Sequence, residues 1–214
     1  MPVDASSTRE KLIDEAARAF AADGVFAASL IEITRKAGQR NRGALHYHFG
    51  SRAGVLCAVL ERHAEFLARR EGELLEKARA APDDDVKAVV EAIVRPATEL
   101  AESGWRGRCY LVILAELVDE DPASLDPDVS NALAHTGGYD VYALLATRMA
   151  DVGPDVRAER FALATAFILR AVADRARVLG RRGRGGRPQL EHEAFVENLV
   201  AMVAAGMSAP QPDR

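Results

Sequence analysis

Apolar residues recur every three or four positions along most of this chain, and the alternation of apolar and polar residues that marks a strand is scarce. The first apolar stripe runs from Leu12 to Phe20. Ser7 and Glu10 have the spacing of a capping box that starts a helix, and Gly24 is suited to end it. The pattern predicts a first helix over 7–24, and its repetition predicts an all-α protein.

Breaks in the pattern divide the rest of the chain into further helices. Ser29 with Glu32 forms a second capping box before a short helix that Gly38 closes. Asn41 is placed to cap a third helix, and Ser51 to cap a fourth and longer one. In total we expect about nine helices, over approximately 7–24, 29–38, 41–49, 51–80, 83–104, 105–118, 139–145, 154–179 and 195–203.

The charge distribution divides the chain into a basic N-terminal head and an acidic body. Residues 1–56 carry eight Lys or Arg against six Asp or Glu, which gives +2, and the net charge of −4 leaves −6 for the remainder. No carboxylate occurs between Glu32 and Glu61. The cations in that interval are Arg35, Lys36, Arg40, Arg42 and Arg52. DNA phosphates are the commonest partners of such a basic island, because neutralising them releases condensed counterions.

Two short helices joined by a turn follow one another inside the basic island. Gly38 ends the first, and the second carries His46, Tyr47 and His48. A helix-turn-helix has this order, and the first residues of its second helix face base edges in the major groove. His46 and His48 also resemble a pair of metal ligands. Residues two apart point to different sides of a helix, so we expect no metal site.

The segment Ala37–Val55 reads AGQRNRGALHYHFGSRAGV. It resembles the tetracycline-repressor (TetR) family of bacterial transcription regulators, whose pattern is alanine-glycine-valine-serine-x-glycine-x-leucine-tyrosine-x-histidine-phenylalanine, then a lysine and a leucine. Asn41 matches the serine cap, His46 occupies the tyrosine position and Arg52 stands for the lysine. The turn is one residue longer here. The resemblance covers roughly Arg9 to Leu60.

Ten residues of the expected DNA-binding domain, residues 1–52, are candidates for contact with DNA. Arg pairs bidentately with guanine and Asn with adenine, so residues 40–42 are expected to read bases. Small residues at 43 and 44 let the helix approach closely, Tyr47 and His48 carry donors for phosphates, and Arg52 is expected to clamp an adjoining phosphate. The set is Arg35, Arg40, Asn41, Arg42, Gly43, Ala44, His46, Tyr47, His48 and Arg52.

The resemblance implies that residues 53–208 form a helical domain that binds an effector and dimerises through its last two helices. Two apolar stripes near the C-terminal end fit this role, and small residues there permit close approach. The expected interface is Phe161, Ala164, Ile168, Ala171, Leu179, Phe195, Leu199, Met202 and Val203. The alternative is that one of these stripes belongs to the core of a single chain.

Polar and aromatic groups within apolar helices are the candidates for the effector site. They are His63, Phe66, Trp105, Cys109, Tyr110, Ile113, Glu116, Tyr139, Tyr142, Arg170 and Asp174. Each also fits a place in a core or an interface. The tyrosines offer hydroxyls for orientation and rings for contact with a small, largely apolar effector. We expect the fourth helix, which starts at Arg52, to transmit effector binding to the head. Cys109 is a further candidate for oxidation, although a lone buried thiol is usually inert.

A basic linker over 180–188 and an acidic loop over 119–128 separate expected helices. The linker run from Arg181 to Arg187 includes Arg182 and Arg184. This segment either binds nucleic acid or is solvated, and the sequence leaves both interpretations open.

Motifs and composition bear on the other functional classes. The chain has two cysteines and no paired-cysteine motif, which favours a reducing cytoplasm, and no apolar run approaches the roughly 20 residues that span a bilayer. No phosphate loop, nucleophile elbow or HExxH motif is present, so we expect no enzyme and no cofactor. The alternatives are a non-specific architectural DNA-binding protein or a helical enzyme. We expect a cytoplasmic homodimer that binds a palindromic operator as a repressor and is released by its effector.

Overall fold

The computed structural model describes residues 5–135, 137–180 and 189–211, and within these ranges the protein is entirely helical apart from turns and loops. The described residues form eleven α-helices and one short 3₁₀ helix: α1 (Ala5–Asp23), α2 (Leu30–Lys36), α3 (Ala44–Phe49), α4 (Arg52–Glu61), α5 (Ala64–Ala80), α6 (Val86–Glu102), α7 (Trp105–Val118), η1 (Pro122–Ser124), α8 (Pro127–Ala134), α9 (Tyr139–Arg148), α10 (Pro154–Gly180) and α11 (His192–Met207). The expected all-α class is confirmed. The linker arginines from Arg181 to Arg187 lie outside the described residues.

Two differences raise the number of α-helices above the expected nine. The single helix expected over 51–80 is two helices, α4 and α5, because the chain turns at Arg62 and His63. A further helix, α8, follows the acidic loop. The Asp126 carboxylate accepts a hydrogen bond from the Asp128 N–H (2.9 Å), which caps the start of α8. The first helix begins at Ala5, so the expected capping box there is wrong.

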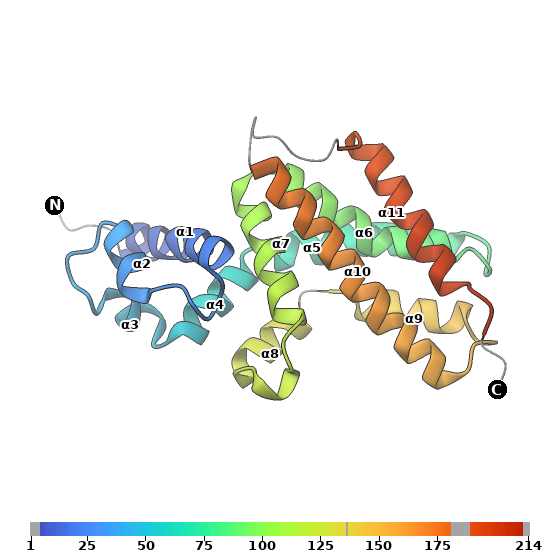
Figure 1. The fold of residues 1–214 in the computed structure, drawn as a ribbon, viewed down its shortest axis with the longest axis horizontal. Helices are drawn as coiled ribbons and strands as arrows, with labels where there is room; N and C mark the ends of the chain where they lie inside the picture. Colours follow the sequence, from blue (N-terminus) through green and yellow to red (C-terminus); the bar gives the residue numbers. More distant parts are fainter. Residues whose placement is uncertain (1–4, 136, 181–188, 212–214) are drawn as a thin grey trace.

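Helices α1 to α4 pack together as a head at one end of the molecule (Figure 1). Their apolar stripes meet in a core to which Phe20, Ile33 and Leu45 contribute, each at most 3% exposed. The Ser29 hydroxyl accepts from the Glu32 N–H (3.4 Å), which confirms the predicted cap of α2. Gly38 has φ +75°, a conformation that side chains disfavour, so a glycine suits the turn after α2.

The body is built around α6, α7 and α10, which pack against one another (Figure 1). α5 lies along α6, and α9 and α11 also pack against α6. α10 crosses α7 and, together with α11, forms the outer face of the body. Among the described helices, none combines the length and the low charge that crossing a membrane requires.

Candidate DNA interface and effector cavity

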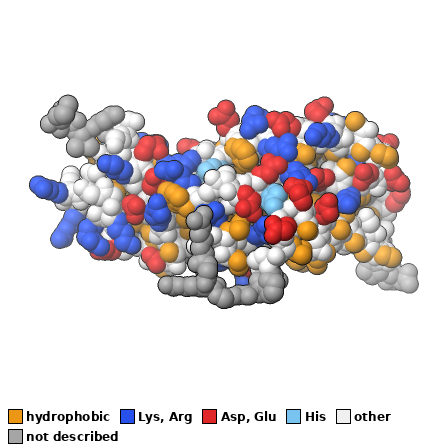
Figure 2. All heavy atoms as spheres, turned by 90° about the horizontal axis from the view of Figure 1, so that it is seen from above, with side chains coloured by type: hydrophobic (Ala, Val, Ile, Leu, Met, Phe, Trp, Pro, Cys, Tyr) orange, Lys and Arg blue, Asp and Glu red, His pale blue; other side chains and the backbone are white. Residues whose placement is uncertain are grey.

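The loop between α2 and α3 carries most of the predicted base-reading residues. Asn41 Oδ1 accepts a hydrogen bond from the Gly43 N–H (2.9 Å), which forms a local turn. α3 begins only at Ala44, so Asn41 shapes the loop before it. The prediction that Asn41 caps this helix is wrong. Arg40 and Arg42 are exposed on the same loop. Figure 2 shows Lys and Arg side chains gathered at this end of the molecule.

One side of α3 faces solvent and the other faces the core of the head. Tyr47 is 84% exposed, and His46 beside it is exposed as well. His48 is half-buried, with its ring edge-on to Tyr47 at 5.2 Å between centroids. Arg35 on α2 is also exposed and forms an ion pair with Glu32 (2.8 Å). Apart from Arg35 on α2, the exposed candidates therefore lie on α3 and the loop before it.

Two of the ten candidates face the protein instead. The Ala44 side chain is buried, so its methyl group packs in the head. Arg52 donates from Nη1 to the Val25 carbonyl (2.7 Å) and from Nη2 to the Ala28 carbonyl (2.8 Å). These bonds fix the connection between α1 and α2. The guanidinium thus holds the backbone of the head, which gives Arg52 a structural role, and its contact with phosphate stays a prediction.

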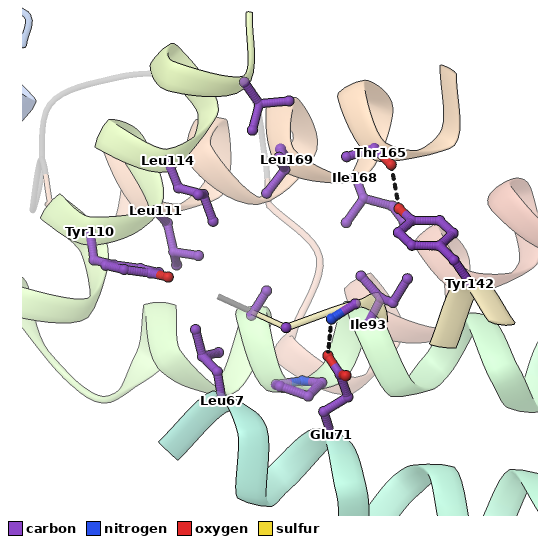
Figure 3. A pocket seen from close by; sticks show the side chains of 15 residues that line it. Leu67, Glu71, Ile93, Tyr110, Leu111, Leu114, Tyr142, Thr165, Ile168 and Leu169 are labelled. Carbon is purple, nitrogen blue, oxygen red and sulfur yellow. Dashed lines mark hydrogen bonds between the residues drawn. The ribbon is translucent and has the colours of Figure 1, made fainter. Parts of the chain in front are cut away.

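The body contains a cavity of about 140 Å³ between α5, α6, α7, α9 and α10 (Figure 3). Its walls are mainly apolar, with Leu111 and Leu114 from α7, Leu67 from α5 and Leu169 from α10. The helices meet here at different angles, and their side chains leave the space between them unfilled. A small, mostly apolar cavity with a few polar groups is the usual form of a ligand site.

Three polar features border the cavity. Glu71 on α5 accepts a hydrogen bond from the Gly138 N–H (2.8 Å). The Tyr142 hydroxyl is hydrogen-bonded to Thr165, which joins α9 to α10 (Figure 3). Burial raises the pKa of Tyr142, although the bond to Thr165 acts in the opposite direction. Tyr110 is fully buried in α7, and its hydroxyl points toward the space between the helices.

Of the eleven effector candidates, only Tyr110 and Tyr142 line this cavity. The others do not border it: His63, Phe66, Trp105, Cys109, Ile113, Glu116, Tyr139, Arg170 and Asp174. Tyr139 is 82% exposed, and Arg170 forms an exposed ion pair with Asp174 (3.3 Å). Ile113 is fully buried in the core.

The remaining candidates contribute to packing. The His63 ring lies edge-on to Tyr110 at 5.2 Å, behind the cavity wall. Phe66 is partly buried against the core. Burial raises the pKa of the Cys109 thiol, which opposes formation of the reactive thiolate. Trp105 lies beneath the Arg18 guanidinium, which is 3.5 Å from the centre of its ring.

Glu71 is not among the residues predicted from the sequence, because a glutamate on a charged helix usually faces solvent. Its neighbours in sequence are Arg70 and Gly72, which give no sign that position 71 is turned inward. The one sequence feature at the other end of this hydrogen bond is the glycine pair at 137 and 138. Both glycines adopt positive φ (+105° and +90°). That backbone directs the Gly138 N–H at Glu71.

α7 lines the cavity and also contacts the head. Arg106 at its start forms an ion pair with Asp14 of α1 (2.6 Å). Glu116 near its end accepts a hydrogen bond from the Val25 N–H (2.8 Å) in the connection after α1. Of the expected fourth helix, α4 ends at Glu61 and does not line the cavity, whereas α5 lines it through Leu67 and Glu71; transmission through that helix stays a prediction.

The predicted dimer stripes lie mostly inside the single chain. Ile168, Leu199 and Val203 are at most 5% exposed, and Ile168 also lines the cavity. Partly buried residues complete the inward stripe: Phe161, Ala164, Ala171, Leu179 and Phe195. Only Met202 of the predicted set is strongly exposed, at 52%. Ile168 and Leu199 therefore belong to the core, and a dimer role for the partly buried residues stays a prediction.

A different apolar surface remains open on α10 and α11. Leu163 is 61% exposed and Phe167 is 42% exposed. They border a shallow groove with Met202 and Gly206 of α11. On a helix, Leu163 lies roughly 140° around the axis from Ile168, so α10 has two apolar faces. One face packs in the core, and the other faces outward.

Comparison with known proteins places this architecture in a family. A family model described as the C-terminal domain of tetracyclin repressor-like proteins matches residues 91–206. The HTH-type transcriptional regulator SrpR from Pseudomonas putida is 47% identical over 57 residues, which cover 27% of this chain and 26% of SrpR. The match thus spans about a quarter of that relative. Because the family model covers more than half of the chain, the chain belongs to the TetR family of transcriptional regulators.

Solved structures share the whole fold at low identity. AibR in complex with isovaleryl coenzyme A and operator DNA has a TM-score of 0.58 at 15% identity, covering 91% of this chain and 97% of that chain. FadR from Bacillus subtilis in complex with stearoyl-CoA has a TM-score of 0.56 at 16% identity, covering 92% and 98%. These likenesses establish the arrangement of head and body.

Proposed function

We propose that this protein is a sequence-specific transcriptional regulator that binds a palindromic operator as a homodimer and is released by a small effector. The observation that carries the proposal is the exposed surface formed by Arg40, Asn41, Arg42 and Tyr47 on a helix-turn-helix. A body with a ligand-sized cavity is joined to that head. Residues 1–52 would bind DNA and residues 53–208 would bind the effector and dimerise. Such a regulator acts in the cytoplasm, and the proposal includes no catalytic step.

The effector would act through α7. Leu111 and Leu114 of this helix border the cavity, whereas Arg106 and Glu116 hold the head. A ligand that shifts α7 changes the orientation of the head, and two heads in a dimer then no longer match the spacing of the half-sites. Repression is the simplest outcome, because an unliganded head is then free to occupy its operator.

The homodimer would form through the exposed face of Leu163, Phe167 and Met202. These side chains form an apolar patch on two neighbouring helices. A two-fold axis through the patch places α10 and α11 of both protomers together as four helices. Small residues such as Ala166 and Gly206 let the helices approach closely.

The first experiment is the selection of bound DNA from a random pool, followed by affinity measurement on the recovered motif and on random DNA. We expect a palindrome whose half-sites lie about one helical turn apart or a small multiple of it. An architectural protein would bind both DNAs equally, and that result would reject sequence-specific regulation.

Substitutions in the head separate base reading from phosphate binding. Arg42→Ala is expected to cost about 1–3 kcal/mol on the operator and to relax specificity at one position. Tyr47→Phe is expected to weaken binding to every sequence alike, because its hydroxyl would contact phosphate. Arg79→Ala, which removes an exposed arginine from the body, is the matched control and leaves operator affinity unchanged. Equal weakening of all sequences by Arg42→Ala would exclude base reading by this residue.

A further inference from the structure

The cavity has one carboxylate in its lining, and the described residues around it include no Lys, Arg or His. We propose that the effector is a small amphiphilic organic cation, whose ammonium group pairs with Glu71 and whose apolar part lies between α7, α9 and α10. This inference rests on the proposed function, since it names the chemical class that the effector site accepts.

Glu71 has spare capacity to accept hydrogen bonds. Its Oε2 accepts from the Gly138 N–H (2.8 Å), and this is its one hydrogen bond among the described residues. An ionised carboxylate offers about four acceptor positions, so most of them remain available to a ligand. Figure 3 shows the carboxylate beside the cavity, on the side opposite Leu114 and Leu169. A ligand that fills the cavity therefore reaches it.

Two other partly buried carboxylates near the core, Glu99 and Asp14, have arginine partners. Arg70 donates two hydrogen bonds to Glu99 (2.8 and 2.9 Å). Asp14 is held by Arg62 and Arg106, and their hydrogen bonds lower its pKa despite its burial. Glu71 differs from these two, because no cation among the described residues pairs with it; like Glu116, it accepts from a backbone N–H, but Glu71 also borders the cavity.

The environment of Glu71 favours a positive partner. Burial raises the pKa of its carboxyl group, the Gly138 N–H acts in the opposite direction, and Asp140 raises the pKa further. A buried carboxylate without a cation is unfavourable, and an arriving ammonium group relieves that cost. The rings of Tyr110 and Tyr142 also border the cavity, and aromatic faces attract cations.

The same lining disfavours an anion. The two solved neighbours are described with coenzyme A thioesters, which carry several phosphate charges. Such a charge would meet Glu71 without a compensating basic side chain in the described lining. The cavity thus accepts a different ligand class from the one in those complexes.

Cavity size defines suitable probes. Each water-sized group needs roughly 10–15 Å³ of cavity volume. The volume of 140 Å³ therefore accommodates about ten non-hydrogen atoms. Octylammonium, octanol and octanoate have about this size and share one alkyl chain. They differ mainly in head-group charge, which is positive, neutral and negative at pH 7.

The test is calorimetric titration of the full-length protein, without DNA, with each of the three probes. We expect octylammonium to bind roughly tenfold to a hundredfold more tightly than octanol, and octanoate to bind most weakly. Glu71→Gln keeps an oxygen acceptor for the Gly138 N–H and removes the charge. It should abolish the advantage of octylammonium while leaving octanol affinity unchanged. Glu65→Gln removes an exposed charge from the same helix and should retain the advantage.

Three results would overturn the inference: tighter binding of octanoate than octylammonium, an octylammonium advantage that persists in Glu71→Gln, or no binding of any probe at millimolar concentration. Release of operator is measured separately, by titrating octylammonium with and without saturating DNA. Linkage requires DNA and effector to weaken each other equally. If octylammonium binds in a Glu71-dependent way but operator affinity does not change, the proposed effector function is rejected. The proposal that the cavity binds an organic cation would then still hold.

Discussion

Leu163→Asp is expected to separate the homodimer into folded monomers. Leu163, Phe167 and Met202 are 61%, 42% and 52% exposed in the single chain. Full burial of such a side chain contributes about 1.5–3 kcal/mol. Burying the exposed half therefore contributes about 1 kcal/mol for each side chain, and two-fold symmetry doubles every contribution. The three residues together provide about 6 kcal/mol of apolar burial to the dimer.

The substitution removes two copies of the most exposed of these side chains and places two carboxylates in their stead. Loss of burial costs about 2 kcal/mol, and desolvation of the carboxylates adds about 1 kcal/mol or more. Neighbouring Arg160 offers little relief, because its guanidinium already donates to the carbonyls of Met207, Ala209 and Pro210. A loss of about 3 kcal/mol weakens dimerisation roughly 100-fold.

Sedimentation velocity over a range of protein concentrations measures this change. The unmodified protein should sediment as a dimer at micromolar concentration, and Leu163→Asp should shift to monomer with an unchanged helical circular dichroism spectrum. Ile31→Asp is the matched control, since Ile31 is 59% exposed on α2 of the head, and it should remain dimeric. A folded Leu163→Asp variant that dimerises as tightly as the unmodified protein would refute this interface.

Two further predictions concern stability. Burial lowers the pKa of His63 from its usual 6.5 to about 4, and two nearby arginines act in the same direction. The unfolded chain therefore binds the proton more readily than the folded protein does. As the pH drops from 6.5 to 4, the free energy of unfolding should fall by about 1–2 kcal/mol, a figure that allows for solvent screening of a partly exposed ring. Denaturant titrations at each pH measure this slope, which His63→Gln should flatten and His135→Gln should leave intact. Gly138→Ala places a side chain at φ +90° and should lower the free energy of unfolding by about 1 kcal/mol. Gly72 lies inside α5 with open space around it, so Gly72→Ala should raise the free energy of unfolding by about 0.5–1 kcal/mol. Thermal unfolding compares the two glycine variants, and equal shifts would refute the backbone argument.

The sequence determined the helices of the head because their signals are local. Ser29 accepts from a backbone N–H three residues away, and Gly38 allows the turn with its own φ. Apolar periodicity placed Leu12 and Phe20 on an inward face, and the basic island placed Arg40 and Arg42 at the surface. Each of these features depends on residues within about two helical turns, so one sequence suffices to find them.

Only the tertiary structure decided the partners of several polar side chains. Arg52 reaches carbonyls 24 and 27 residues earlier, Glu71 meets a backbone N–H 67 residues later, and Glu116 binds the head across 91 residues. Nothing within a helical turn of these residues specifies such contacts. The same holds for the break at His63, which no proline or glycine marks.

The tertiary structure also decided which apolar face of α10 turns inward. Periodicity shows that a helix has an apolar stripe, and α10 has two, one through Ile168 and one through Leu163. Helices α6, α7 and α11 cover the first and leave the second open. The choice depends on how distant helices pack as a whole, because burial is a property of the assembled surface and not of the spacing along one helix.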